Sequence, residues 1–245
     1  MKLITAVAAV LLTLFATGCY VGEDDDAQPP APAQTAAEAQ GGGESRCPGG
    51  SLEGCFTFDQ MSEYMEVVTP MVAQFFQERY PNVPAPRDIV FVPRGQQAAT
   101  ACGSIATSES YEYCGANQSI YVGQDLIWEF YRNAGDAAPA IGLAHEWGHH
   151  LQVMLGLPQP RTASQSVQFE NQADCISGAW AKYADSKGWL ESEDDIQDIE
   201  ALLTGIGSRE GAGRDHGTTE ERSRAFDAGF GQDIQACNSY TLRTR

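Results

Sequence analysis

Apolar residues recur three or four positions apart along several stretches of the chain, which is the spacing of one face of an α-helix. Met61, Tyr64, Val68 and Met71 form the first such series, and Pro70 predicts a break or kink within it. The same spacing, with flanking breakers and capping residues, predicts five further helices at about 125–131, 139–155, 165–185, 194–203 and 218–230.

Two short runs of consecutive apolar residues have the length of buried strands. They are 89–92, which ends before Pro93, and 119–122. The last predicted helix opens with Thr218 and Glu221 at the spacing of a capping box, which fixes where it begins. The pattern therefore predicts many helices and few strands.

The first residues have the features of an export signal. Lys2 is followed by an apolar run over 3–16 and by small residues that end at Cys19, which predicts a lipoprotein signal peptide over 1–18. The run is too short for a transmembrane helix, and acids follow it. The residue three positions before Cys19 is Ala where Leu is commoner. Cleavage at an ordinary secretory site, which would release the protein, therefore remains the alternative.

The next segment differs in composition from the rest of the chain. Residues 19–46 are rich in Pro, Ala, Gln, Gly and acids, and they contain too few apolar side chains to form a core. We expect a disordered tether that links a lipidated Cys19 in the membrane to one globular, monomeric domain over 47–245. The predicted location is the cell envelope, at the periplasmic or extracellular face.

The charge balance narrows the choice of partners. Fifteen Lys and Arg stand against 33 Asp and Glu, which gives a net charge of −18. Such a surface repels phosphate backbones, so no nucleic-acid partner is expected. The negative charge either keeps the surface solvated or attracts a basic substrate.

The cysteines suit an oxidising compartment. Of seven cysteines, Cys19 takes the lipid and six are left to pair, which allows 15 connectivities. Sequence alone does not choose among these connectivities, but short loops favour two of the pairs. The pairs favoured by short loops are Cys47 with Cys55 and Cys102 with Cys114. The two remaining cysteines, Cys175 and Cys237, form the third expected pair.

The predicted helix over 139–155 contains the sequence His145-Glu146-Trp147-Gly148-His149. Four residues turn a helix by about 400°, so both imidazoles leave the same face and can share one cation. Two His and a carboxylate with one open position suit a single Zn²⁺ ion. Glu146 is then placed to take a proton from a water molecule at the open side.

A third ligand is available on the next predicted helix. Glu170 would complete the metal site, and Asp174, four residues further on, would accept a hydrogen bond from the outer nitrogen of His145. Two acids at this spacing usually form a solvated face. Here the neighbours are apolar and predict burial, which requires a partner for the acids. These neighbours are Phe169, Ala173, Cys175, Ile176 and Trp180.

These motifs resemble those of the bacterial neutral zinc metallopeptidase family, in order and spacing from about Cys102 to Tyr240. The resemblance is carried by 143–152, by Glu170–Cys175 with Gly178–Trp180, and by His216–Thr218 leading to Arg222, Gly229 and Cys237. It implies a mostly helical, zincin-like α+β fold with a small sheet over the active-site helix. By the same analogy the strand at 119–122 forms the sheet edge, where an extended peptide can align.

Two further histidines have other expected roles. If Cys175 and Cys237 are joined, the C-terminal helix is stapled against the metal helix, and His216 can reach a developing oxyanion. The alternative is that His216 only caps or orients the helix start. His150 points about 100° away from His149, so we expect it to be a surface or core residue and not a ligand.

The predicted function is zinc-dependent hydrolysis of peptide bonds in a peptide or protein substrate. Glu146 takes the proton of water and then protonates the leaving amine. One alternative is a catalytically silent zinc-binding envelope lipoprotein that serves as a scaffold or binding module, with a closed fourth position on the metal. Another is cleavage of a peptide crosslink in the cell wall.

Overall fold

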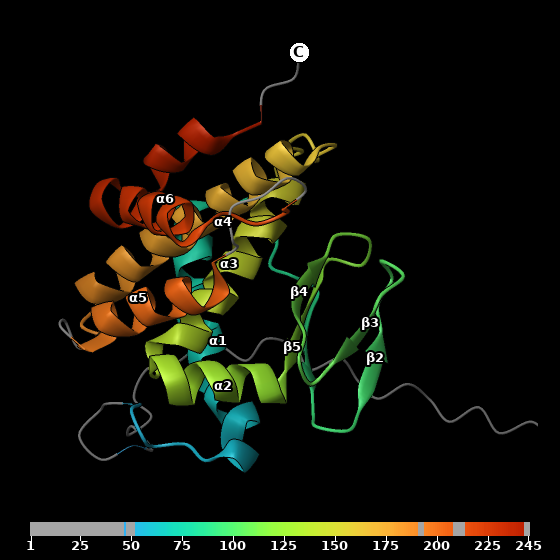
Figure 1. The fold of residues 1–245 in the computed structure, drawn as a ribbon, viewed down its shortest axis with the longest axis vertical. Helices are drawn as coiled ribbons and strands as arrows, with labels where there is room; N and C mark the ends of the chain where they lie inside the picture. The colour runs from blue at the N-terminus through green and yellow to red at the C-terminus, as the bar shows by residue number, and fades with distance from the viewer. Residues whose placement is uncertain (1–46, 48–51, 191–193, 208–213, 243–245) are drawn as a thin grey trace, which may run out of the picture. The chain divides into compact units, whose positions relative to one another are not determined.

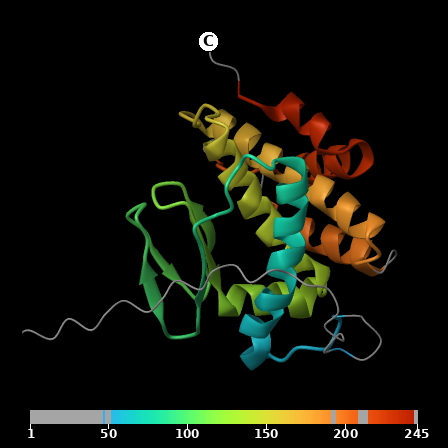
Figure 2. The ribbon, with the colours of Figure 1, turned by 180° about the vertical axis from the view of Figure 1, so that it is seen from behind.

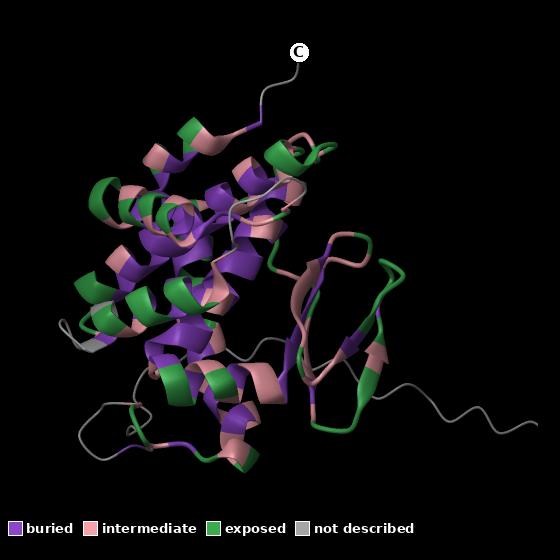
Figure 3. Ribbon diagram, viewed as in Figure 1, coloured by how far each residue is buried: buried purple, intermediate pink, exposed green. Residues whose placement is uncertain are grey.

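The helix that carries the two predicted histidine ligands is the centre of the folded unit. The computed structural model describes residues 47, 52–190, 194–207 and 214–242. The predicted signal peptide and tether lie outside these residues. Helix α3 (Ala137–Met154) has 14 buried residues among its 18, so it is surrounded on most sides (Figure 3). It contacts α1 (Met61–Arg79), α2 (Gln124–Ala134), α4 (Ala163–Ser186) and α5 (Asp194–Ile206), and α6 (Thr219–Gln232) packs on α4 and α5 (Figure 1).

Helix α4 lies directly against α3, and α6 lies against α4. A Cβ atom on Gly148 of α3 would lie 3.1 Å from the Cα atom of Ala173 of α4, and a Cβ atom on Gly229 of α6 would lie 1.8 Å from the carbonyl oxygen of Cys175 of α4. The approach at Gly229 leaves no room for a side chain, and the approach at Gly148 would require Ala173 to shift slightly. The two glycines therefore bring the backbones of the three helices to the separation at which their side chains form one site.

Helix α1 packs on the far side of α3 (Figure 2). It runs without interruption through Pro70, so the predicted break is wrong. Proline removes one backbone hydrogen bond. The buried face of α1, which includes Val68, Val72 and Phe75 on both sides of the proline, holds the helix together by packing. The remaining predicted helices are confirmed, with ends that shift by a few residues.

The strands form two small sheets on one side of the helices (Figure 1). In the first, β1 (Asp88–Val92) pairs in parallel with β5 (Ser119–Gly123), which pairs antiparallel with β4 (Tyr111–Cys114). Strands β2 (Gln97–Ala99) and β3 (Ile105–Thr107) form a separate antiparallel pair.

Strand β5 is the middle strand of its sheet, so its prediction as the sheet edge is wrong. All five of its residues are buried, which is typical of a central strand covered on both faces. The edge nearest the helices is β4, which the apolar pattern did not predict because its four residues, Tyr-Glu-Tyr-Cys, include a charge and form too short a run.

All three expected disulfides are confirmed: Cys47 with Cys55, Cys102 with Cys114, and Cys175 with Cys237. The last of them joins α4 to the 3₁₀-helix η2 (Ile234–Tyr240). We had expected this disulfide to staple the C-terminal helix against the metal helix, and that expectation is wrong. The bond fixes the C-terminal segment to α4, the helix that carries Glu170. Within the described ranges, no helix has both the length and the apolarity that are needed to cross a bilayer.

Candidate metal centre

Three side chains from α3 and α4 meet at one point. The Nε2 atoms of His145 and His149 are 3.1 Å apart, as expected for residues one helical turn apart on α3. The Glu170 Oε2 atom of α4 lies 3.2 Å from His145 Nε2 and 3.4 Å from His149 Nε2. Ligand atoms bound tetrahedrally to zinc at about 2.0–2.1 Å are about 3.3 Å apart. The three atoms are therefore spaced as the ligands of one zinc ion would be.

The protonation of the two rings also fits a cation. Each ring uses its Nδ1–H as a donor, to Asp174 from His145 and to Gln152 from His149. When the rings are neutral, each Nε2 atom then has a lone pair that faces the other ring and Glu170. A proton on one nitrogen can bridge only two of the three atoms, whereas one metal ion can bind both nitrogens and the Glu170 oxygen. The residues present therefore fit a zinc ion.

His145 is held by a buried acid that has a second partner. Asp174 Oδ1 accepts a hydrogen bond from His145 Nδ1 at 2.9 Å and another from the guanidinium of Arg222 at 2.8 Å. Asp174 is 2% exposed and Arg222 4%. Arg222 on α6 gives the buried Asp174 carboxylate a cationic partner, and the same carboxylate oxygen orients the His145 ring.

His149 is held by two side-chain amides in series. His149 Nδ1 donates to Gln152 Oε1 at 2.8 Å. Gln152 Nε2 donates to the Phe169 carbonyl at 2.8 Å and to Gln172 Oε1 at 3.0 Å. These two acceptors determine the orientation of the Gln152 amide, with its oxygen toward His149. Gln172 in turn donates to the carbonyl of Cys237 in η2. The tautomer of His149 is thus set by a chain of hydrogen bonds that ends at the segment held by the third disulfide.

Glu146 is on α3, on the side that faces the edge strand β4. It is 8% exposed, and its carboxylate accepts a hydrogen bond from the backbone N–H of Tyr113. The Tyr113 hydroxyl contacts His150 Nδ1 at 3.0 Å, and His150 Nε2 donates to the Pro84 carbonyl at 2.8 Å. Of the two places expected for His150, surface or core, the structure has the core. There it links β4 to α3, and the backbone donor to Glu146 is held in place with it.

The charges at the centre change the affinity of its groups for protons. Burial raises the pKa of Glu146, which makes it a stronger base than an exposed glutamate. Burial alone would lower the pKa of His145, but the neighbouring carboxylates of Asp174 and Glu170 outweigh it and raise the pKa to about 10. The facing imidazoles lower the pKa of Glu170 against the effect of burial. The cluster therefore favours a positive charge at its middle.

His216 lies at the rim of the centre. Its Nε2 atom is 3.5 Å from Glu170 Oε2, its Nδ1 atom is 3.0 Å from the carboxylate of Asp215, and its side chain is 46% exposed. The cap of α6 is Thr218, in a capping box with Glu221. Capping of the helix, one of the two roles expected for His216, therefore belongs to Thr218.

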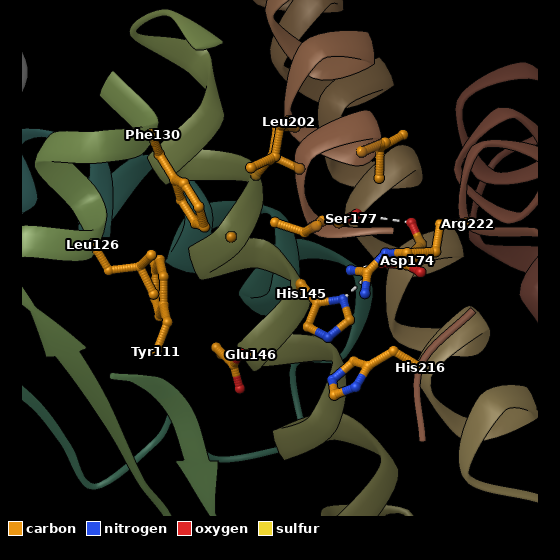
Figure 4. A pocket seen from close by; sticks show the side chains of 14 residues that line it. Tyr111, Leu126, Phe130, His145, Glu146, Asp174, Ser177, Leu202, His216 and Arg222 are labelled. Carbon is orange, nitrogen blue, oxygen red and sulfur yellow. Dashed lines mark hydrogen bonds and ion pairs between the residues drawn. The ribbon is translucent and has the colours of Figure 1, made fainter. Parts of the chain in front are cut away.

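A cavity of about 230 Å³ opens beside His145 and Glu146. Figure 4 shows the side chains that surround it, with Asp174 and His216 also in the lining. The centre is therefore not closed on the side where Glu146 lies.

Among the residues that hold the ligands, Asp174 was predicted from the sequence, whereas the roles of the others were missed. Gln152 is three positions after His149, a spacing that places it on the same side of the helix, and this was the only local signal. Gln172, Arg222 and Tyr113 reach the centre from other elements, so no spacing along the chain indicates their roles.

The fold and this centre define a class of protein: an α+β protein of zincin type, in which an HExxH helix and the next helix bring two His and one Glu together. The chain belongs to the family described as "Putative neutral zinc metallopeptidase", whose family model matches residues 8–240. The resemblance found in the sequence is thereby confirmed.

Two curated relatives illustrate the family, and both are described as uncharacterized. A protein of Mycobacterium bovis is 30% identical over 175 residues, which is 59% of this chain and 60% of the relative. The protein YpfJ of Escherichia coli K12 is 31% identical over 170 residues, 58% of each chain. The chain thus spans about three fifths of the length of the curated relatives it matches. No solved structure matches it.

Proposed function

We propose that this protein is a zinc metallopeptidase that hydrolyses peptide bonds of a peptide or protein substrate. The observation that supports it best is the convergence of His145 Nε2, His149 Nε2 and Glu170 Oε2 within 3.1–3.4 Å, with both rings oriented by donors on the opposite side. Three protein ligands leave one position open, which is typical of a catalytic zinc site.

Zinc, when bound, supplies a Lewis acid that polarises a carbonyl group and makes water more acidic. Glu146 lines the cavity next to the ligands, where it accepts the proton of the attacking water and later delivers this proton to the leaving amine. Its raised pKa suits a group that must both take and give a proton near neutral pH. His216, partly exposed at the rim, is placed to donate to the developing oxyanion.

The catalytically silent zinc lipoprotein is the alternative function. A structural site usually closes its fourth position with a protein ligand. Among the described residues, the group of side chains that can hold a metal here consists of His145, His149 and Glu170 alone. The open cavity beside them favours catalysis.

We further propose that a lipidated Cys19 anchors the enzyme in the cell envelope.

The test is cleavage of a mixed peptide library by the purified domain, with and without a chelator. We expect zinc at about one ion per chain and cleavage that the chelator abolishes. Glu146→Gln should keep the zinc and lose cleavage by at least 1,000-fold, because the base is gone while the ligands remain. Glu129→Gln, at an exposed position of α2, is the matched control. Cleavage at the normal rate by Glu146→Gln would refute the proposal.

A further inference from the structure

The cavity beside Glu146 has walls of two different kinds. Its polar side is formed by the residues of the centre, and the rest is formed by apolar side chains from α2, α3 and α5 (Figure 4). The apolar walls consist of Leu126, Phe130, Ile141, Leu202, Leu203 and Ile206.

Two hydroxyl groups near these apolar walls already have partners. The Tyr111 hydroxyl donates to the Pro139 carbonyl at 2.8 Å, and the Ser177 hydroxyl donates to the Asp174 carbonyl at 2.7 Å. A polar group packed against these walls would lose its water without gaining either hydroxyl as a donor. An apolar group would gain contacts with the walls.

The size of the cavity sets the size of its occupant. An apolar protein cavity of about 150 Å³ accepts a benzene ring. The cavity here, at about 230 Å³, has room for a ring or a branched aliphatic group of that size. Gly142 is part of the lining, and a Cβ atom there would lie 2.7 Å from the Tyr111 ring.

The position of the cavity indicates which part of a substrate enters it. Its lining includes Glu146 but neither His149 nor Glu170. Glu146 hands its proton to the leaving amine, so the residue that carries this amine lies on the Glu146 side of the centre. The side chain of that residue is the one that faces the apolar walls.

We propose that this cavity is a specificity site for a large apolar side chain, such as Leu or Phe, on the amine side of the bond that is cleaved. The inference rests on the proposed peptidase function. The substrates it predicts are peptides with a bulky apolar residue directly after the cleavage point. Small, polar and charged residues at that position are disfavoured.

The test uses two peptide hydroxamates that differ only in the side chain next to the chelating group, isobutyl in one and hydrogen in the other. Calorimetric titration of the zinc-loaded protein should show that the isobutyl compound binds at least 10-fold more tightly, since it buries a whole leucine side chain. This readout does not require that any peptide be cleaved.

Two variants fill the cavity from two different helices, each at a half-buried position. Ile206→Phe extends from α5 and Leu126→Phe from α2. In each, the preference for isobutyl should fall below 3-fold, while zinc content and thermal unfolding remain normal. Ala201→Phe, at an exposed position of α5 away from the cavity, should keep the full preference.

Equal binding of the two hydroxamates by the unmodified protein would overturn the inference, as would a preference that survives both filling variants. Cleavage of a peptide library without regard to the residue after the cleavage point would overturn the inference alone. Absence of zinc binding and of hydroxamate binding would overturn the proposed function, and the inference with it.

Discussion

The replacement of Gln152 by Leu tests whether the chain of amides behind His149 serves the metal. Gln152 is 0% exposed and makes three hydrogen bonds, with His149, Phe169 and Gln172. Leucine keeps most of the volume and removes all three. The His149 ring then loses the acceptor that fixes its tautomer, so its Nε2 lone pair is no longer guaranteed to face the metal position.

The expected loss of zinc affinity and the expected loss of stability both follow from these contacts. Loss of a hydrogen-bond partner behind a metal ligand weakens zinc binding by about 10- to 100-fold, or roughly 1.4–2.7 kcal/mol. Three hydrogen bonds at about 1 kcal/mol each lower the free energy of unfolding of the metal-free domain by about 3 kcal/mol. The two effects are separated when unfolding is measured on metal-free protein.

Zinc affinity is measured by competition with a chromophoric chelator, and stability by urea denaturation. Gln168→Leu is the matched control, because Gln168 is on α4 and donates at 3.4 Å to the Thr241 carbonyl, without contact to His149. It should cost about 1 kcal/mol or less and leave zinc affinity unchanged. If Gln152→Leu loses stability but binds zinc as tightly as the unmodified protein, the amides are structural and the reasoning is wrong.

Three further predictions follow from the contacts around the centre. The pair Cys175→Ala and Cys237→Ala opens a loop with a sequence separation of 62, so urea denaturation should show a loss of about 4 kcal/mol, and a loss below 1 kcal/mol would contradict this. Arg222→Met leaves the Asp174 carboxylate buried without its cation and should lower the free energy of unfolding by about 3–5 kcal/mol. Arg224→Met, at an exposed position of the same helix, should lower it by about 0.5 kcal/mol or less, and equal losses in urea denaturation would refute the role of the ion pair. Zinc at 100 times its dissociation constant should stabilise the domain by about 2.7 kcal/mol relative to chelator-treated protein, and identical unfolding curves would show that the folded state does not bind it.

The sequence was informative where the chemistry depends on a local repeat. His145 and His149 are one helical turn apart, so their common face follows from helix geometry alone. The position of Glu170 followed from a second helix with its own apolar neighbours. The capping box at Thr218 and the short-loop disulfides were predictable for the same reason, because each depends on residues close together in the chain.

The rest depends on contacts between distant segments. The place of β4 at the sheet edge was hidden because its short run has no clear apolar pattern, and the apolar run of β5 indicated burial without indicating neighbours on both sides. Arg222 reaches Asp174 from 48 residues away, and the amide chain from Gln152 ends in η2. Such contacts are set by the packing of α3, α4 and α6, which no spacing in the sequence reveals.

We expect a single zinc ion to bind between the imidazoles of His145 and His149 and the carboxylate of Glu170. Anomalous X-ray scattering from crystals of the zinc-loaded domain, recorded on both sides of the zinc absorption edge, tests it directly. We predict one peak at about 2.0–2.1 Å from the Nε2 atoms of His145 and His149 and about 2.0–2.2 Å from a Glu170 oxygen. An empty position there would contradict the account, above all if the peak lay instead among the carboxylates of Asp136, Asp195 and Asp198, which are within 4.8 Å of one another.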